Sequence, residues 1–253
     1  MIQILLFLAS FASPFTNAAE PSGQLTLTSS KEQTHLIELY SSEGCSSCPP
    51  ADRWVAGLRT NSKLWQSFVP INFHVDYWNK LGWVDRFSHQ SFTQRQYNYA
   101  NEWGARTVYT PGFVLNGRDW KLKSPKEYEQ KSKDVGVLTA TVDQKSLSLK
   151  VKFSPLDKNQ KNYRVYAAIL GNGLKTNVTK GENAGEKLEH EFVVLGMSNT
   201  NLSPAGSDKS TFTADFTLPK AQITPKTTSV AVWVSGPESL TPIQAVGGDF
   251  KSK

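Results

Sequence analysis

Hydrophobic and polar residues alternate differently in the two halves of the chain. The first half mixes period-two runs with apolar residues at helical spacing. Strands are predicted there at 35–40, 68–76 and 113–115, and helices at 51–59 and 90–103. The second half has six period-two runs separated by turn residues, at 138–142, 146–153, 163–170, 189–195, 210–218 and 229–235. Six short strands at this spacing are typical of an antiparallel β-sandwich.

The change of pattern predicts two domains. An α/β domain is expected over 20–136 and an all-β antiparallel sandwich over 137–253. The chain has 253 residues, of which 38% are hydrophobic and 20% charged, so it is long enough and apolar enough for two packed cores. The net charge of +6 comes from scattered lysines and arginines without a dense basic run. Nucleic-acid partners are therefore not expected.

The N-terminus has a pattern of its own. Residues 2–12 are mostly apolar, and small residues follow up to Ala19. This is typical of a secretory signal peptide over 1–19, although no Lys or Arg precedes the apolar run. The run is shorter than the ~20 apolar residues that span a bilayer. We expect export to the periplasm or the medium without stable membrane insertion after cleavage; an uncleaved, lipid-facing N-terminus is the alternative.

The candidate chemistry lies where the first predicted strand ends. Cys45 and Cys48 are the only cysteines in the chain, and they stand between that strand and a predicted helix. A C-x-x-C in this position is typical of the redox site of thioredoxin-like folds. Unpaired N–H groups and the positive end of the helix dipole favour a thiolate there. We predict that Cys45 is the more exposed, attacking sulfur and that Cys48 resolves the mixed disulfide.

Thr110, Pro111 and Glu43 complete the predicted redox site. The order helix, Thr110-Pro111, strand and hairpin turn favours a cis peptide bond opposite the cysteines, where Pro111 would shape a groove for a substrate. An ordinary trans proline at the start of an edge strand is the alternative. Glu43 stands two residues before Cys45 and is a candidate proton acceptor for the buried thiol.

His74 supports a second hypothesis about the cysteines. With the thiolates of Cys45 and Cys48 it would make a copper site, because soft thiolates select Cu(I). A hydrogen-bonded strand histidine that binds no metal is the competing interpretation. A purely structural disulfide is a further alternative, although closing so short a loop contributes little stability.

One long segment gives the chain a family resemblance. Residues 38–52, ELYSSEGCSSCPPAD, resemble the hallmark of the exported bacterial family DUF1223. The segments HVDYW at 74–78, YTP at 109–111 and GENAG at 181–185 fit the same family. The resemblance implies a thioredoxin-like domain followed by a β-rich domain, and it supplies no established reaction.

Together these observations predict an exported thiol–disulfide oxidoreductase-like protein. Its partners would be protein thiols or disulfides, and no cofactor is implied. Two other functions remain as alternatives: a copper-handling protein, and a non-enzymatic binding protein whose disulfide is structural.

Overall fold

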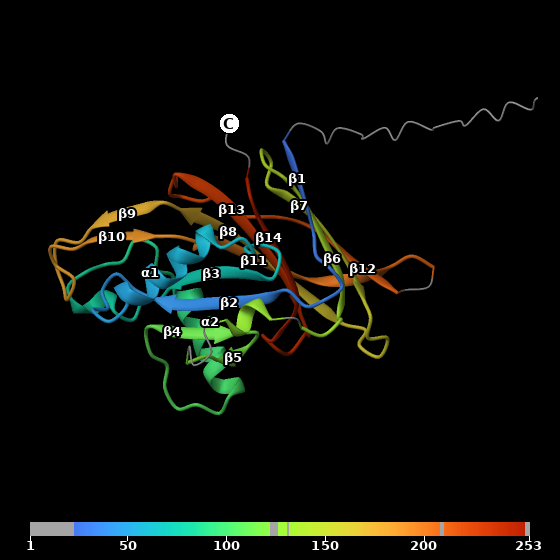
Figure 1. Cartoon of the computed structure of the whole chain (residues 1–253), viewed down its shortest axis with the longest axis horizontal. Helices are drawn as coiled ribbons and strands as arrows, with labels where there is room; N and C mark the ends of the chain where they lie inside the picture. The colour runs from blue at the N-terminus through green and yellow to red at the C-terminus, as the bar shows by residue number, and fades with distance from the viewer. Residues whose placement is uncertain (1–22, 122–125, 131, 208–209, 251–253) are drawn as a thin grey trace, which may run out of the picture.

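Figure 1 shows the fold as a computed structural model, which describes residues 23–121, 126–130, 132–207 and 210–250. The predicted signal peptide at 1–19 lies outside the described residues. Two α-helices and fourteen β-strands form among these residues. The elements of the first half are β1 (Gln24–Thr28), β2 (His35–Ser41), α1 (Pro49–Gly57), β3 (Phe68–His74), α2 (Gln90–Glu102), β4 (Gly112–Leu115) and β5 (Arg118–Asp119).

From Gly136 on, all regular elements in the described part of the chain are strands. These strands are β6 (Gly136–Asp143), β7 (Ser148–Pro155), β8 (Tyr163–Asn172), β9 (Leu174–Asn177), β10 (Lys187–His190), β11 (Val193–Ala205), β12 (Thr211–Thr217), β13 (Thr227–Ser235) and β14 (Pro242–Asp249). β9 and β10 form a separate two-stranded hairpin, and the other twelve strands belong to one mixed sheet.

The long strand β11 joins the two halves of that sheet. Its first residue, Val193, pairs in parallel with Asn72 of β3, and its far end pairs antiparallel with β12. On its other edge β8 runs antiparallel to it, followed by β13 and β14. β1, which precedes the cysteines in the chain, pairs with β6 of the second half. Figure 1 shows β2 to β5 at one end and β1, β6, β7 and β12 at the other, with the long strands between them.

The predicted fold class, an α/β thioredoxin-like domain followed by an antiparallel sandwich, is therefore wrong. The protein is mostly β, with one large mixed sheet that takes strands from both halves. The physical reason lies in β8, which is apolar on both faces. Val165, Ala167 and Ile169 face a core with β6 and β7, whereas Ala168 and Leu170 face a core with β2 and β3. The domain limits at 19 and 136 stay predictions.

A buried ion pair attaches α2 to the sheet. Arg95 of α2 donates hydrogen bonds to both carboxylate oxygens of Glu38 on β2, at 2.8 and 3.1 Å. The hydroxyl groups of Tyr40 and Tyr99 donate to the same carboxylate. Since the Glu38 side chain is fully buried and that of Arg95 is 4% exposed, each charge depends on the other for compensation.

Candidate functional site

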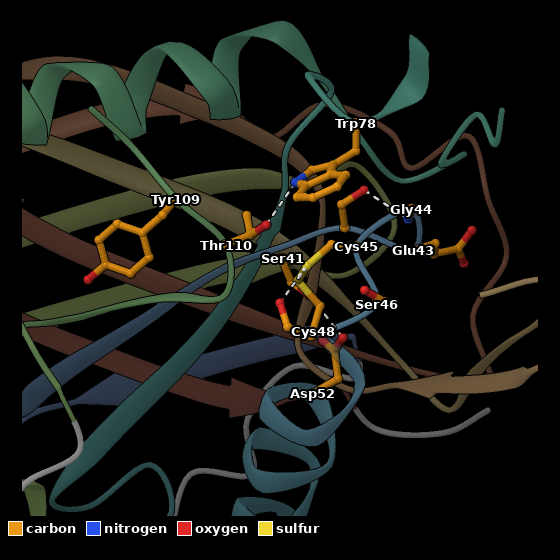
Figure 2. The surroundings of a disulfide bond; sticks show 12 residues. Ser41, Glu43, Gly44, Cys45, Ser46, Cys48, Asp52, Trp78, Tyr109 and Thr110 are labelled. Carbon is orange, nitrogen blue, oxygen red and sulfur yellow. Dashed lines mark hydrogen bonds between the residues drawn. A yellow bond between two sulfur atoms is a disulfide. The ribbon is translucent and has the colours of Figure 1, made fainter. Parts of the chain in front are cut away.

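Cys45 and Cys48 are joined by a disulfide between the end of β2 and the start of α1, with their Cα atoms 5.4 Å apart (Figure 2). Cys48 is the N-cap of α1 and prolines fill the first two helical positions. These prolines have no N–H, and the N–H groups of Ala51 and Asp52 donate to the carbonyl oxygen of Cys48. Stabilisation of a thiolate by helical N–H groups, which the sequence suggested, is therefore weakened.

The disulfide lies directly beneath the protein surface. Both cysteines are 0% exposed, so the expectation that Cys45 is the more exposed sulfur is wrong for the oxidised protein. The two residues between them, Ser46 and Ser47, are exposed. The Ser47 hydroxyl oxygen lies 3.3 Å from Cys45 Sγ.

Trp78 lies beside Gly44 and Cys45, next to the disulfide (Figure 2). Its indole N–H donates to the Thr110 hydroxyl at 2.8 Å, which brings Thr110 beside the cysteines (Figure 2). Gly44 permits this close approach, because a Cβ on it would lie only 3.1 Å from Trp78 Cβ. The Thr110–Pro111 peptide bond is cis, as predicted. The predicted pair Thr110-Pro111 is thus connected to the site by the hydrogen bond between Thr110 and the Trp78 indole.

The loop between β9 and β10 holds the C-x-x-C turn from the other side. The buried Asn183 amide donates to the carbonyl oxygens of Glu43 and Cys45, at 2.8 and 3.0 Å. The Glu182 carboxylate accepts a hydrogen bond from the Ser46 N–H at 3.0 Å. Sequence reasoning gave neither residue a role, and the signal that points to them is the GENAG segment of the family resemblance.

Glu43 and Asp52 enclose a buried histidine from the second half of the chain. Glu43 Oε1 lies 3.4 Å from Nε2 of His190, and Asp52 Oδ1 lies 3.7 Å from Nδ1. The Trp83 indole N–H donates to the other oxygen of Glu43 at 2.8 Å. Figure 2 shows Glu43 pointing away from the disulfide, whereas Asp52 is turned from α1 toward it. The predicted proton acceptor therefore contacts a histidine that the sequence did not suggest.

The charges of this cluster set its pKa values. Burial lowers the pKa of His190, but the contacts with Asp52 and Glu43 outweigh it and raise the pKa to about 9. Burial raises the pKa of Asp52, but the contact and charge of His190 outweigh it, and the pKa lies below its ordinary value. In the absence of other ligands, His190 therefore carries a proton at neutral pH between two carboxylates.

His74 belongs to the same buried region. Its Nδ1 atom lies 2.7 Å from Asp85 Oδ2, and both side chains are fully buried. Asp85 also accepts hydrogen bonds from the N–H groups of Glu43 and Phe87. Burial raises the pKa of Asp85, but the charge and hydrogen bond of His74 and the Glu43 N–H outweigh it and lower this pKa. His74 is thus grouped with carboxylates, while the two sulfurs of the predicted copper site are bonded to each other.

Three buried side chains have potential metal-ligating atoms within 4.8 Å of one another: Asp52, His74 and His190. They come from α1, β3 and β10, so they are far apart in the sequence. Sequence reasoning singled out His74 alone, and no local spacing links the three. Asp52 lies inside the segment that resembles the family hallmark.

The fold and the site define a class of mostly β proteins that have a buried disulfide next to buried acidic residues and histidines. The sequence profile of the family "Protein of unknown function (DUF1223)" matches residues 36–235. Since the match spans most of the chain, the protein belongs to this family, as the sequence resemblance indicated.

Two solved structures are similar in fold. Protein AGR_C_4864 from Agrobacterium tumefaciens is 21% identical with a TM-score of 0.61, and the match covers 89% of this chain and 98% of that one. HBP35 of Porphyromonas gingivalis is 15% identical with a TM-score of 0.58, over 88% of this chain and 76% of that one. No curated protein matches the sequence. In the described part of the chain, neither helix has the length and apolar character needed to cross a bilayer.

Proposed function

We propose that the protein is an exported thiol–disulfide oxidoreductase that exchanges its Cys45–Cys48 disulfide with a thiol or disulfide of a partner protein. The observation that carries this proposal is the disulfide itself, formed by the only two cysteines at the start of α1 and just below the exposed Ser46 and Ser47. An oxidising compartment outside the cytoplasm would keep such a bond formed.

The exchange needs no cofactor. A thiolate of the partner attacks Sγ of Cys45, the bond to Cys48 breaks, and Cys48 leaves with the electron pair and takes up a proton from solvent. The partner's second thiolate then attacks the partner sulfur of the mixed disulfide and releases Cys45. Two electrons pass to this protein, which becomes a dithiol, while the partner's dithiol becomes a disulfide. The reverse sequence oxidises this protein.

Cys45 is assigned as the exchanging sulfur because of its surroundings. It lies next to the exposed Ser46 and Ser47, and the Ser47 hydroxyl is placed to donate a hydrogen bond to a Cys45 thiolate. Cys48 is the N-cap of α1 and is the resolving sulfur. Because both sulfurs are buried, the protein must open locally before a partner can react, and we propose that the cover that moves is the Trp78 side chain beside Cys45.

Loosening that cover is expected to speed up exchange. Thr110→Val removes the acceptor of the Trp78 indole N–H and keeps the side-chain shape. Losing a hydrogen bond of about 1 kcal/mol favours the opened state by roughly five- to tenfold, so reduction by dithiothreitol should accelerate to that extent. The rate is measured by alkylating the released thiols and counting them by mass spectrometry. Trp103→Phe, which loses a comparable indole bond to the Gly117 carbonyl oxygen, is the control and should leave the rate unchanged.

The direct test is Cys45→Ser. This variant is expected to lose dithiol-dependent reduction of a disulfide substrate completely, and Ser46→Ala is expected to keep it. The reduction potential of the wild-type pair should lie between about −270 and −120 mV, the range of exchanging C-x-x-C pairs. Full activity of Cys45→Ser would exclude the catalytic role.

The burial of both cysteines favours a second candidate function. In a non-enzymatic binding protein the disulfide would only hold the turn that Asn183 contacts. Its reduction potential would then lie below about −300 mV, as structural disulfides do. A native protein whose disulfide stays oxidised in excess dithiothreitol would support this candidate and contradict redox exchange.

A further inference from the structure

The two buried histidines both have ring nitrogens that lack hydrogen-bond partners among the described residues. His74 has its Nδ1 atom against Asp85 at 2.7 Å, and its Nε2 atom has no hydrogen-bond partner among the described residues. His190 has its Nε2 atom 3.4 Å from Glu43 Oε1, and neither of its ring nitrogens has a hydrogen-bond partner within the described part of the chain. Since both rings are fully buried, the unpaired nitrogens require an explanation.

Asp52 is the group on which the two histidines converge. Its Oδ1 atom lies 3.7 Å from Nδ1 of His190, close to the ~3.4 Å that separates two ligands on a tetrahedral ion with bonds of about 2.0–2.1 Å. Ser41 and Asn72 donate hydrogen bonds to its two oxygens, at 2.9 and 2.8 Å, and fix its orientation. The ligating atoms of Asp52, His74 and His190 all lie within 4.8 Å of one another.

We propose that Asp52, His74 and His190 bind one divalent transition-metal ion, for which zinc is the best match. Imidazole and carboxylate are the ligand types of zinc sites. A histidine that binds a metal usually has its other nitrogen against a carboxylate, and Asp85 and Glu43 occupy that place behind His74 and His190.

The metal-free alternative accounts for only part of this geometry. A protonated His190 offsets the charges of Glu43 and Asp52, but neither of its ring nitrogens makes a hydrogen bond among the described residues. It leaves Nε2 of His74 buried and unpaired within the described structure. An ion shared by the three side chains explains the unpaired nitrogens of both histidines at once, and it would link the β9–β10 hairpin to α1, whose N-cap is Cys48.

The experiment uses the full chain with its disulfide intact. The protein is stripped of metal with a chelator, dialysed and titrated with Co²⁺, followed by Zn²⁺. We expect one equivalent of Co²⁺ to bind with visible absorption bands, and Zn²⁺ to displace it. His190→Gln should abolish binding, and Asp85→Asn should weaken it by about 10–100-fold. His89→Gln, at an exposed helix cap, is the matched control and should bind as the wild type does.

A measurement on the wild type covers the case in which a variant does not fold. The chain has four histidines, and nuclear magnetic resonance of their rings should show Zn²⁺ shifting the signals of two and leaving those of His35 and His89 in place. The double variant Cys45→Ser, Cys48→Ser should keep the site, which separates this result from the fate of the redox proposal. Absence of stoichiometric binding, shifts at other histidines, or dependence on the cysteines would each overturn the metal site.

Discussion

Replacing Glu38 with alanine is expected to lower the free energy of unfolding by about 3–5 kcal/mol, because the buried Arg95 loses its counter-charge. The guanidinium group lies 5.2 to 5.6 Å from the ring centroids of Phe73, Tyr99, Tyr166 and Trp233. These rings attract the cation but cannot replace the two hydrogen bonds from Arg95 to Glu38. Urea unfolding followed by circular dichroism measures the loss.

The control for this prediction removes both charges. The double variant Glu38→Leu, Arg95→Met is expected to be more stable than Glu38→Ala, because neither partner is left charged and buried. A cost below about 1 kcal/mol for Glu38→Ala, as in an exposed ion pair, would contradict the assigned role.

Trp233→Ala is expected to lower the free energy of unfolding by about 3–5 kcal/mol, because it leaves a cavity at a fully buried position. The indole stacks on Tyr166 with ring centroids 5.4 Å apart and an interplanar angle of 8°. It belongs to the same core cluster as residues of β2 and β3. The loss should therefore appear as weaker amide-exchange protection in β2 as well as in β13. Trp103→Ala, at a side chain that is 37% exposed, is the control and should cost much less.

This prediction also tests the continuity of the sheet. If β2 kept its exchange protection while β8 and β13 lost theirs, the two halves would unfold independently. The shared core of β8 would then not couple them. A single unfolding transition in both regions is the expected result.

The sequence alone was sufficient for the local elements. The limits of four elements lie within two residues of the predicted ones: β2, α1, β3 and α2. Their apolar spacing depends only on neighbours along the chain, so the sequence shows it directly. The C-x-x-C between strand and helix, the cis bond before Pro111 and the family were also predicted correctly. Local steric and hydrophobic preferences determine the helices and strands, whereas the cis bond was predicted from the order of the elements and the family from a matching sequence segment.

Pairing between distant segments decided the rest. β1 is absent from the strands that the pattern predicts, and its pairing with β6 makes it a strand. Residues 167–170 form a continuous apolar run, which is typical of a strand buried on both faces, but the run does not say which cores it separates. The pairing between strands that are distant in the sequence produces one sheet, where the sequence predicted two separate domains.

The site shows the same division. The sequence determined where the two cysteines stand and that they can form a disulfide. Asn183 holds the backbone of the C-x-x-C turn, and the contacts of His190 with Glu43 and Asp52 join residues more than a hundred positions apart. Such contacts leave no periodic signal, because their free energy comes from burial and charge compensation in the assembled core. Only the tertiary structure could reveal them.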